Sequence, residues 1–142
     1  MASTDSEVRT LLESWSEAAR TKDIDRLMSL YSPDIVYFDV VPPLQFAGHA
    51  AVRGNFSRWF DSYKSSIGQE IHDSHILASG DVATAYMLIR ASGTLKDGRE
   101  IGYWVRATIC CERSDHMWLI THEHVSLPFD LESGKAAMDL VP

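Results

Sequence analysis

Apolar residues in the first half of the chain recur every three or four positions, which is the spacing of an amphipathic helix. A capping box formed by Thr4 and Glu7 begins the first such stretch, and Asp23 provides an N-cap for a second, shorter one. An apolar run between the second and third stretches ends at two prolines, which lack the N–H group that a strand needs. We therefore predict helices over about 5–21, 24–31 and 50–64, and a strand over 35–41.

The second half of the chain has the spacing of β-strands. Four apolar stretches are separated by short turns that carry Gly80, Gly98 and Asp115, which is typical of an antiparallel meander. Helices that precede a run of strands indicate an α+β fold, with three N-terminal helices packed on a strongly curved, mostly antiparallel sheet. The strands are predicted over 69–78, 82–92, 99–111 and 117–126.

The chain shows neither an internal linker nor a repeat, so we predict a single domain over 1–142. Within it, 128–142 is expected to form a C-terminal tail with a weak helical pattern at 135–140.

Both faces of the later strands carry apolar side chains. In 82–90 and in 102–111, apolar residues occupy odd and even positions alike. Three helices can cover one face of a sheet, so the other face needs a second layer. A second copy of the chain is the simplest source of that layer, and we expect a homodimer that forms through the sheet face.

Composition narrows the classes of partner. The 142 residues carry a net charge of −7, and 45% of them are hydrophobic. An acidic surface repels nucleic acid and anionic membranes, so we expect neither as a partner. A leader pattern and a long apolar run are both missing, so a cytoplasmic location is expected. The adjacent Cys110 and Cys111 point to opposite faces of a strand, so we expect both to be reduced core residues.

The last predicted strand carries the most informative polar pattern. Its pleat places Trp118, Ile120, His122, His124 and Ser126 on one face. That face is apolar at one end and polar at the other, which suits a strand that packs in the core and then lines a cavity. Histidine titrates near neutral pH, so the two histidines are candidates for proton transfer in that cavity.

Three motifs along the chain form a known arrangement. They are Tyr37-Phe38-Asp39 leading to Phe46-x-Gly48-x-x-Ala51-Val52-Arg53, Arg106-x-Thr108, and Trp118-x-Ile120-x-His122-x-His124-x-Ser126. Together they resemble the SnoaL-like, ketosteroid isomerase-related family of the nuclear transport factor 2-like superfamily, over nearly the whole chain up to Phe129. The resemblance implies a cystatin-like α+β cone with an internal pocket. Members include isomerases, polyketide cyclases, dehydratases and non-catalytic binding modules, so the chemistry stays open.

The resemblance also implies that an arginine lies in the cavity, which is Arg106 here. A guanidinium in that position would hold a carboxylate, phenolate or enolate. We assign catalysis to His124, Asp39 and Arg106, and we expect a small apolar or aromatic ligand. The ligand-binding residues are expected to be Tyr37, Phe56, Trp59, Asp73, Met87, Trp104, Thr108, His122 and Ser126.

Two functions follow from this set. In the first, His124 or Asp39 transfers a proton while Arg106 and Tyr37 stabilise an oxyanion, so that a carbonyl compound is isomerised, cyclised or dehydrated without a cofactor. Ketosteroid isomerase uses an aspartate base with a tyrosine and a protonated aspartate, and that complete set has no counterpart in this chain. In the second, the domain is a binding or assembly module without turnover.

A third function is metal binding. A His-x-His pair on a strand, here His122 and His124, can place two imidazoles on one ion. The third ligand would then be His75, Asp73 or Asp39.

Overall fold

The three predicted helices are present in the computed structural model, which describes residues 3–142. Ser3, rather than Thr4, caps the first helix, since its side chain accepts a hydrogen bond from the backbone N–H of Ser6 at 3.1 Å. Asp23 caps the second helix as predicted. The helices are α1 (Thr4–Arg20), α2 (Ile24–Met28) and α3 (His49–Asp61).

The described part of the chain contains one six-stranded sheet in the order β2-β1-β6-β5-β4-β3. Strands β3 to β6 form the predicted antiparallel meander, and β1 pairs with β6 in parallel. The strands are β1 (Tyr31–Phe38), β2 (Phe46–Ala47), β3 (Gly68–Ser79), β4 (Val82–Thr94), β5 (Glu100–Ser114) and β6 (Met117–Ser126).

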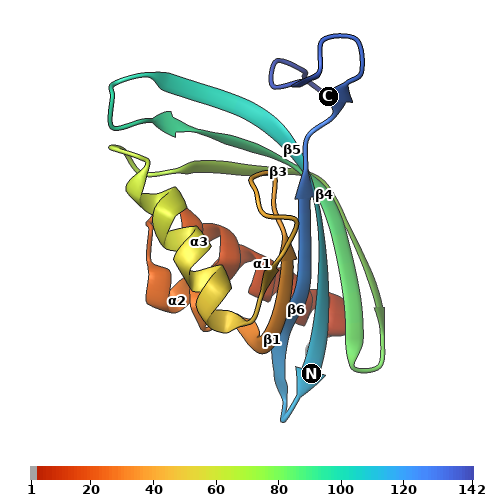
Figure 1. Cartoon of the computed structure of the whole chain (residues 1–142). Coiled ribbons are helices and arrows are strands. Elements are labelled where there is room, and N and C mark those ends of the chain that lie inside the picture. The colour runs from red at the N-terminus through yellow and green to blue at the C-terminus, as the bar shows by residue number, and fades with distance from the viewer. Residues whose placement is uncertain (1–2) are drawn as a thin grey trace.

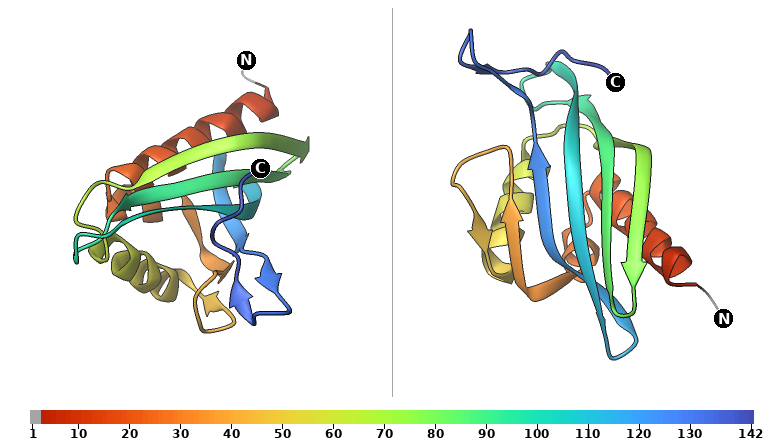
Figure 2. Two further views of the ribbon diagram at one scale, coloured as in Figure 1. Left: turned by 90° about the horizontal axis from the view of Figure 1, so that it is seen from above. Right: turned by 90° about the vertical axis from the view of Figure 1, so that its right-hand side faces the viewer.

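All three helices lie on one side of the curved sheet, and within residues 3–142 the opposite side carries no helix (Figures 1 and 2). The carboxyl end of α3 is fixed to β4, because the Lys64 N–H donates to the Thr94 carbonyl at 2.8 Å. Gly93 permits this close approach, since a Cβ there would come within 2.8 Å of the Tyr63 ring. The predicted α+β architecture is confirmed.

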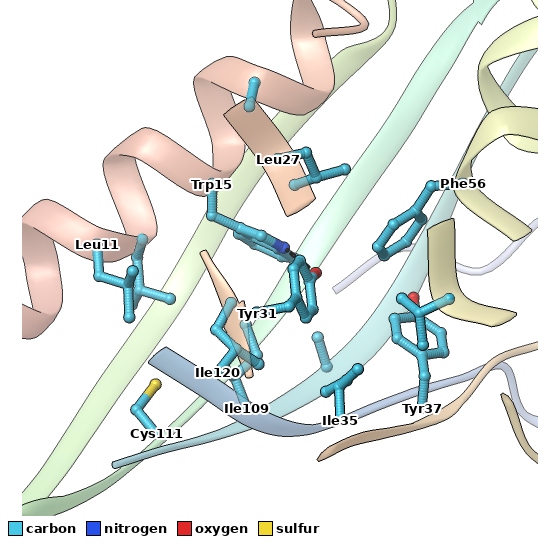
Figure 3. Close-up of a cluster of buried hydrophobic side chains, with 14 of the residues drawn as sticks. Leu11, Trp15, Leu27, Tyr31, Ile35, Tyr37, Phe56, Ile109, Cys111 and Ile120 are labelled. Atoms are coloured by element: carbon cyan, nitrogen blue, oxygen red, sulfur yellow. Dashed lines mark hydrogen bonds between the residues drawn. The ribbon is translucent and has the colours of Figure 1, made fainter. Parts of the chain in front are cut away.

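The core lies between the helices and the concave face of the sheet (Figure 3). Trp15 of α1 is buried against Tyr31 of β1, and its indole N–H donates to the Tyr31 hydroxyl at 2.8 Å. Phe56 of α3 packs edge-on against the Tyr37 ring at 5.3 Å between centroids. The apolar stripes that predicted α1 and α3 are therefore the surfaces that cover the sheet.

Strand β6 contains an irregularity that decides which side chains face the core. Cys111 pairs with Ile120 but Cys110 pairs with His122, so Thr121 is an extra residue in the β6 strand. Such a bulge reverses the pleat beyond it. Trp118 and Ile120 point to the helices before the bulge, and the odd-numbered residues do so after it.

The C-terminal segment corrects the prediction of a helical patch at 135–140. It forms a small hairpin in which β7 (Phe129–Asp130) pairs with β8 (Lys135–Ala136). The hairpin projects beyond the end of the main sheet (Figure 1). None of the helices in the described part of the chain is both long and apolar enough to cross a membrane.

The two cysteines are unpaired, as predicted. Cys111 faces the core, and burial raises the pKa of its thiol to about 12. Cys110 is half-buried on the opposite face. Both therefore behave as packing residues of β5.

Candidate functional site

A cavity of about 430 Å³ lies between the helices and the concave face of the sheet. Its walls are mostly apolar, as is usual for small-molecule sites. Phe56 and Trp59 of α3 form one wall, as predicted, and Ile89, Val105 and Val125 of the sheet form the other. The cavity lies between the helices and the sheet, where the resemblance implies an internal pocket.

Glu123 is the most deeply buried acidic residue of this cavity, with 1% of its surface exposed. The Tyr31 hydroxyl donates to its Oε1 at 2.5 Å, and the Trp15 indole N–H donates to the same hydroxyl at 2.8 Å. The chain of donors runs from α1 through β1 to β6, and Figure 3 shows its first link between Trp15 and Tyr31. Hydrogen bonds that link α1, β1 and β6 thus hold the Glu123 carboxyl group in place.

Burial raises the pKa of the Glu123 carboxyl to about 7. The negative charge of Asp39 raises this pKa further, whereas hydrogen bonds from Tyr31 and Tyr37 act in the opposite direction. A carboxyl group with a pKa near 7 exists in both protonation states at neutral pH. It can therefore accept a proton and return it, which is the requirement for general acid–base catalysis.

Asp39 and Tyr37 lie beside Glu123 because β1 and β6 run in parallel with Tyr37 opposite Glu123. Both residues line the cavity, as predicted. The Asn55 amide of α3 donates to Asp39 Oδ2 at 2.7 Å and fixes that carboxylate. Burial, and then the charge of Glu123, raise the pKa of the Tyr37 hydroxyl well above its usual range. Tyr37 therefore stays protonated and can donate a hydrogen bond.

The predicted cavity positions of Arg106, His122 and His124 are wrong. All three lie on the outer face of the sheet, because the bulge at Thr121 turns the even-numbered residues of β6 away from the helices. Arg106 is exposed, and its Nε donates to Ser126 Oγ at 3.1 Å, so Ser126 is also outside the cavity. His124 is exposed on the same face.

His122 has a structural role on the outer face. Its Nδ1 lies 2.7 Å from the Val36 carbonyl oxygen, and its ring packs edge-on against Phe38. It therefore ties β6 to β1, which is a structural rather than a catalytic contact.

Four further expected ligand residues lie outside the cavity. Thr108 is exposed opposite His124, and Trp104 packs against the His72 ring on the outer face. Asp73 is exposed at a bulge of β3. Met87 faces inward but is part of the solid core rather than the cavity wall. The pleat of β4 and β5 explains the positions of Met87, Trp104 and Thr108.

The residues that the sequence suggested as metal ligands do not come together in the structure. Among residues 3–142, His, Cys, Asp and Glu form no group of three that could hold a metal ion. His75 stacks on Tyr86 on the outer face of the sheet, and two strands, β4 and β5, separate it from His122.

Glu123 is the residue that sequence reasoning missed. A regular pleat puts it on the face opposite to Trp118 and Ile120. The sequence does carry a signal, because apolar residues shift from even positions before Thr121 to odd positions, Val125 and Leu127, after it. That shift is the pattern of a β-bulge.

A family model of the SnoaL-like domain matches residues 8–130. The chain belongs to the SnoaL-like domain family. No curated protein matches it. Among solved structures it is similar to a nuclear transport factor 2-like protein of unknown function from Pseudomonas putida KT2440, at 34% identity over 100% of each chain and a TM-score of 0.89.

Two more distant structures share the fold of this SnoaL-like domain. One is provisionally assigned as an aromatic ring hydroxylase from Novosphingobium aromaticivorans, with 21% identity, 91% of this chain and 94% of the other covered, and a TM-score of 0.77. The other is provisionally assigned as a dehydratase from Streptomyces avermitilis, with 19% identity, 84% and 93% covered, and a TM-score of 0.76. At these identities the likeness concerns the fold alone.

Proposed function

We propose that this SnoaL-like domain binds a small, largely apolar carbonyl compound and catalyses its isomerisation, cyclisation or dehydration by proton transfer through Glu123. The observation that carries the proposal is a buried carboxyl group with a pKa of about 7 on the wall of an apolar cavity. No cofactor is needed, because the carboxyl group itself stores the proton between two steps. The dehydratase among the structural neighbours is consistent with this class of reaction.

In the first step, ionised Glu123 removes a proton from a carbon next to the carbonyl group. The C–H electron pair forms a carbon–carbon double bond, and the π pair of the carbonyl moves onto its oxygen, which becomes an enolate oxygen. The Tyr37 hydroxyl, which remains protonated, donates a hydrogen bond to that oxygen. Glu123 is then neutral and returns the proton to a second carbon in an isomerisation or to a leaving hydroxyl group in a dehydration. In a cyclisation the enolate carbon bonds to a second carbonyl carbon of the ligand, and the proton goes to the alkoxide that this bond creates.

Asp39 supports this cycle from beside Glu123. Its negative charge disfavours ionisation of Glu123 and so keeps that carboxyl group basic. Asn55 holds Asp39 in place through a 2.7 Å hydrogen bond. This arrangement replaces the roles that the sequence assigned to His124 and Arg106.

The test is hydrogen–deuterium exchange at the α-carbon of aromatic and alicyclic ketones in D2O, followed by NMR. Glu123→Gln is expected to lower the exchange rate at least about 100-fold, because the proton acceptor is removed. His124→Ala is the matched control on the same strand and is expected to leave the rate within twofold. Equal rates in the wild type and Glu123→Gln would contradict the proposal.

A non-catalytic binding module is the second candidate. It is favoured by the 2.5 Å hydrogen bond from Tyr31, which occupies one oxygen of Glu123 in the free protein. Ketones that bind in the cavity without any exchange at the α-carbon would decide for this function.

We also propose that two copies of the chain associate through the outer face of the sheet. That face exposes Leu77, Val82 and Tyr86, whose exposed fractions are 64%, 53% and 46%. A dimer would cover these side chains. Light scattering is expected to give twice the mass of the chain for the wild type and a monomer for Tyr86→Lys, and a monomeric wild type would contradict the dimer.

A further inference from the structure

Gln69 of β3 lines the cavity with only 7% of its surface exposed, and its side-chain oxygen has no hydrogen-bond partner. A buried amide oxygen without a hydrogen-bond partner is destabilising when no ligand is bound. It becomes favourable when a ligand supplies the missing hydrogen bond. Gln69 therefore marks a second polar contact of the cavity, separate from Glu123.

The register of the sheet leaves room for a ligand group beside Gln69. Gln69 pairs with Ala91 of β4, and Ala91 pairs with Tyr103 of β5, so the three side chains form one row on the concave face. Ala91 is the smallest of the three and separates the two polar ones. A depression bordered by an amide and a phenol results, and all three residues line the cavity.

The two polar contacts lie at different levels of the sheet. Glu123 pairs with Ile109, whereas Gln69 lies in the row of Tyr103, farther toward the start of β5 and across β4. Apolar side chains, including Ile89 and Val105, line the wall between them. A molecule that touches both ends must therefore be elongated and apolar in its middle.

Charge limits the group that can reach Gln69. A carboxylate would face the unpartnered oxygen of the amide and would share the cavity with Asp39 and Glu123, so it is disfavoured. Arg58 also borders the cavity, but its side chain is exposed and water screens its charge. A neutral hydroxyl group fits best, because it donates to the amide oxygen and accepts from the amide nitrogen.

We propose that the ligand of this cavity is an uncharged, elongated aromatic or alicyclic molecule whose far end carries a hydroxyl group that donates to the Gln69 side-chain oxygen. This inference deepens the proposed function, since it uses the same cavity, but it does not require turnover. It assigns Gln69 as a specificity-determining residue.

The test uses two probe series of different length, 4-hydroxybiphenyl against 4,4'-dihydroxybiphenyl, and 4-hydroxystilbene against 4,4'-dihydroxystilbene. Binding is followed by quenching of tryptophan fluorescence. In at least one series the second hydroxyl is expected to tighten binding by wild-type protein about tenfold, the value of one well-placed hydrogen bond. Gln69→Leu and Gln69→Met are expected to remove this preference and to leave the affinity for the monohydroxy probe within twofold.

Two further measurements show whether Gln69 recognises the ligand hydroxyl rather than stabilising the fold or taking part in catalysis. The melting temperature of Gln69→Leu is expected to equal or exceed that of the wild type, because the side-chain oxygen has no protein partner to lose. Glu123→Gln is expected to retain the preference for the second hydroxyl even though it stops exchange. Wild-type protein that shows no preference in either series, or Gln69 variants that keep it or weaken both probes equally, overturns the proposal.

Discussion

Both faces of the sheet carry ionisable side chains, but only the concave face buries them. On the concave face, Glu123 is buried, hydrogen-bonded to Tyr31 and part of a cavity wall. On the outer face, Arg106 and His124 are exposed. The difference teaches that residue type alone does not identify a site, because burial is what raises the pKa of Glu123 to about 7.

A single extra residue in β6 decides which of its later residues face the helices and which face outward. Thr121 is the bulged position of β6, and its hydroxyl donates to the Cys110 carbonyl at 3.2 Å. Beyond it Glu123 faces the helices and His124 faces outward. The bulge therefore determines that Glu123, and not His124, lines the cavity.

Insertion of one alanine between His122 and Glu123 is expected to have the largest effect. The bulge at Thr121 stays in place, and the added residue turns Glu123 outward and His124 against the helices. Burying an unpartnered imidazole and disrupting the core should cost more than about 4 kcal/mol of unfolding free energy. Urea unfolding measures this, and deletion of Thr121 is the control, because it removes only the extra residue and leaves Glu123 facing the helices. An insertion variant as stable as the wild type would contradict the expected change of face.

Replacement of Glu123 by glutamine is expected to change the pH dependence of stability. The folded-state pKa of about 7 exceeds the unfolded value of 4.5, so the native state binds more protons between these values. Stability should therefore be highest below pH 4.5 for this group and fall by roughly 3 kcal/mol as the pH rises to 7.

Glu123→Gln removes this titration, so the difference in unfolding free energy between the variant and the wild type should grow in favour of the variant from pH 4.5 to 7. Urea unfolding across that range measures the difference, and Asp34→Asn on the exposed start of β1 is the control. A pH-independent difference would contradict the raised pKa.

Arg106→Ala is expected to have the smallest effect. Its guanidinium is exposed and makes one hydrogen bond, to Ser126, so the loss in unfolding free energy should stay within about 0.5 kcal/mol. The measurement is urea unfolding at low protein concentration. A loss above about 1 kcal/mol would show that Arg106 is buried by a second copy of the chain or by a ligand.

Local patterns in the sequence predicted most of the fold. The apolar stripe of α1, the short helix capped by Asp23 and the four-strand meander all form near their predicted bounds. Phe56, Trp59, Tyr37 and Asp39 reach the cavity because their helix and strand continue regularly up to it. Helical spacing and strand alternation are short-range properties. They can be seen in each segment of the sequence without knowing which element packs against it.

The catalytic candidate and the second polar contact required the tertiary structure. The apolar shift after Ile120 hints at the bulge, but only pairing with β5 on one side and β1 on the other fixes the extra residue at Thr121. Likewise, the Gln69 side-chain oxygen is buried without a partner only because strand β3 packs against β4 and α1.

The sequence by itself determined the α+β class and the order of the elements, because these follow from local periodicity, and its motifs carried the resemblance to the family. The tertiary structure decided which face of β6 looks into the cavity and which acid is removed from water. Both depend on the packing of strands that are far apart along the chain, and the pKa of Glu123 is a property of that enclosure rather than of the residue.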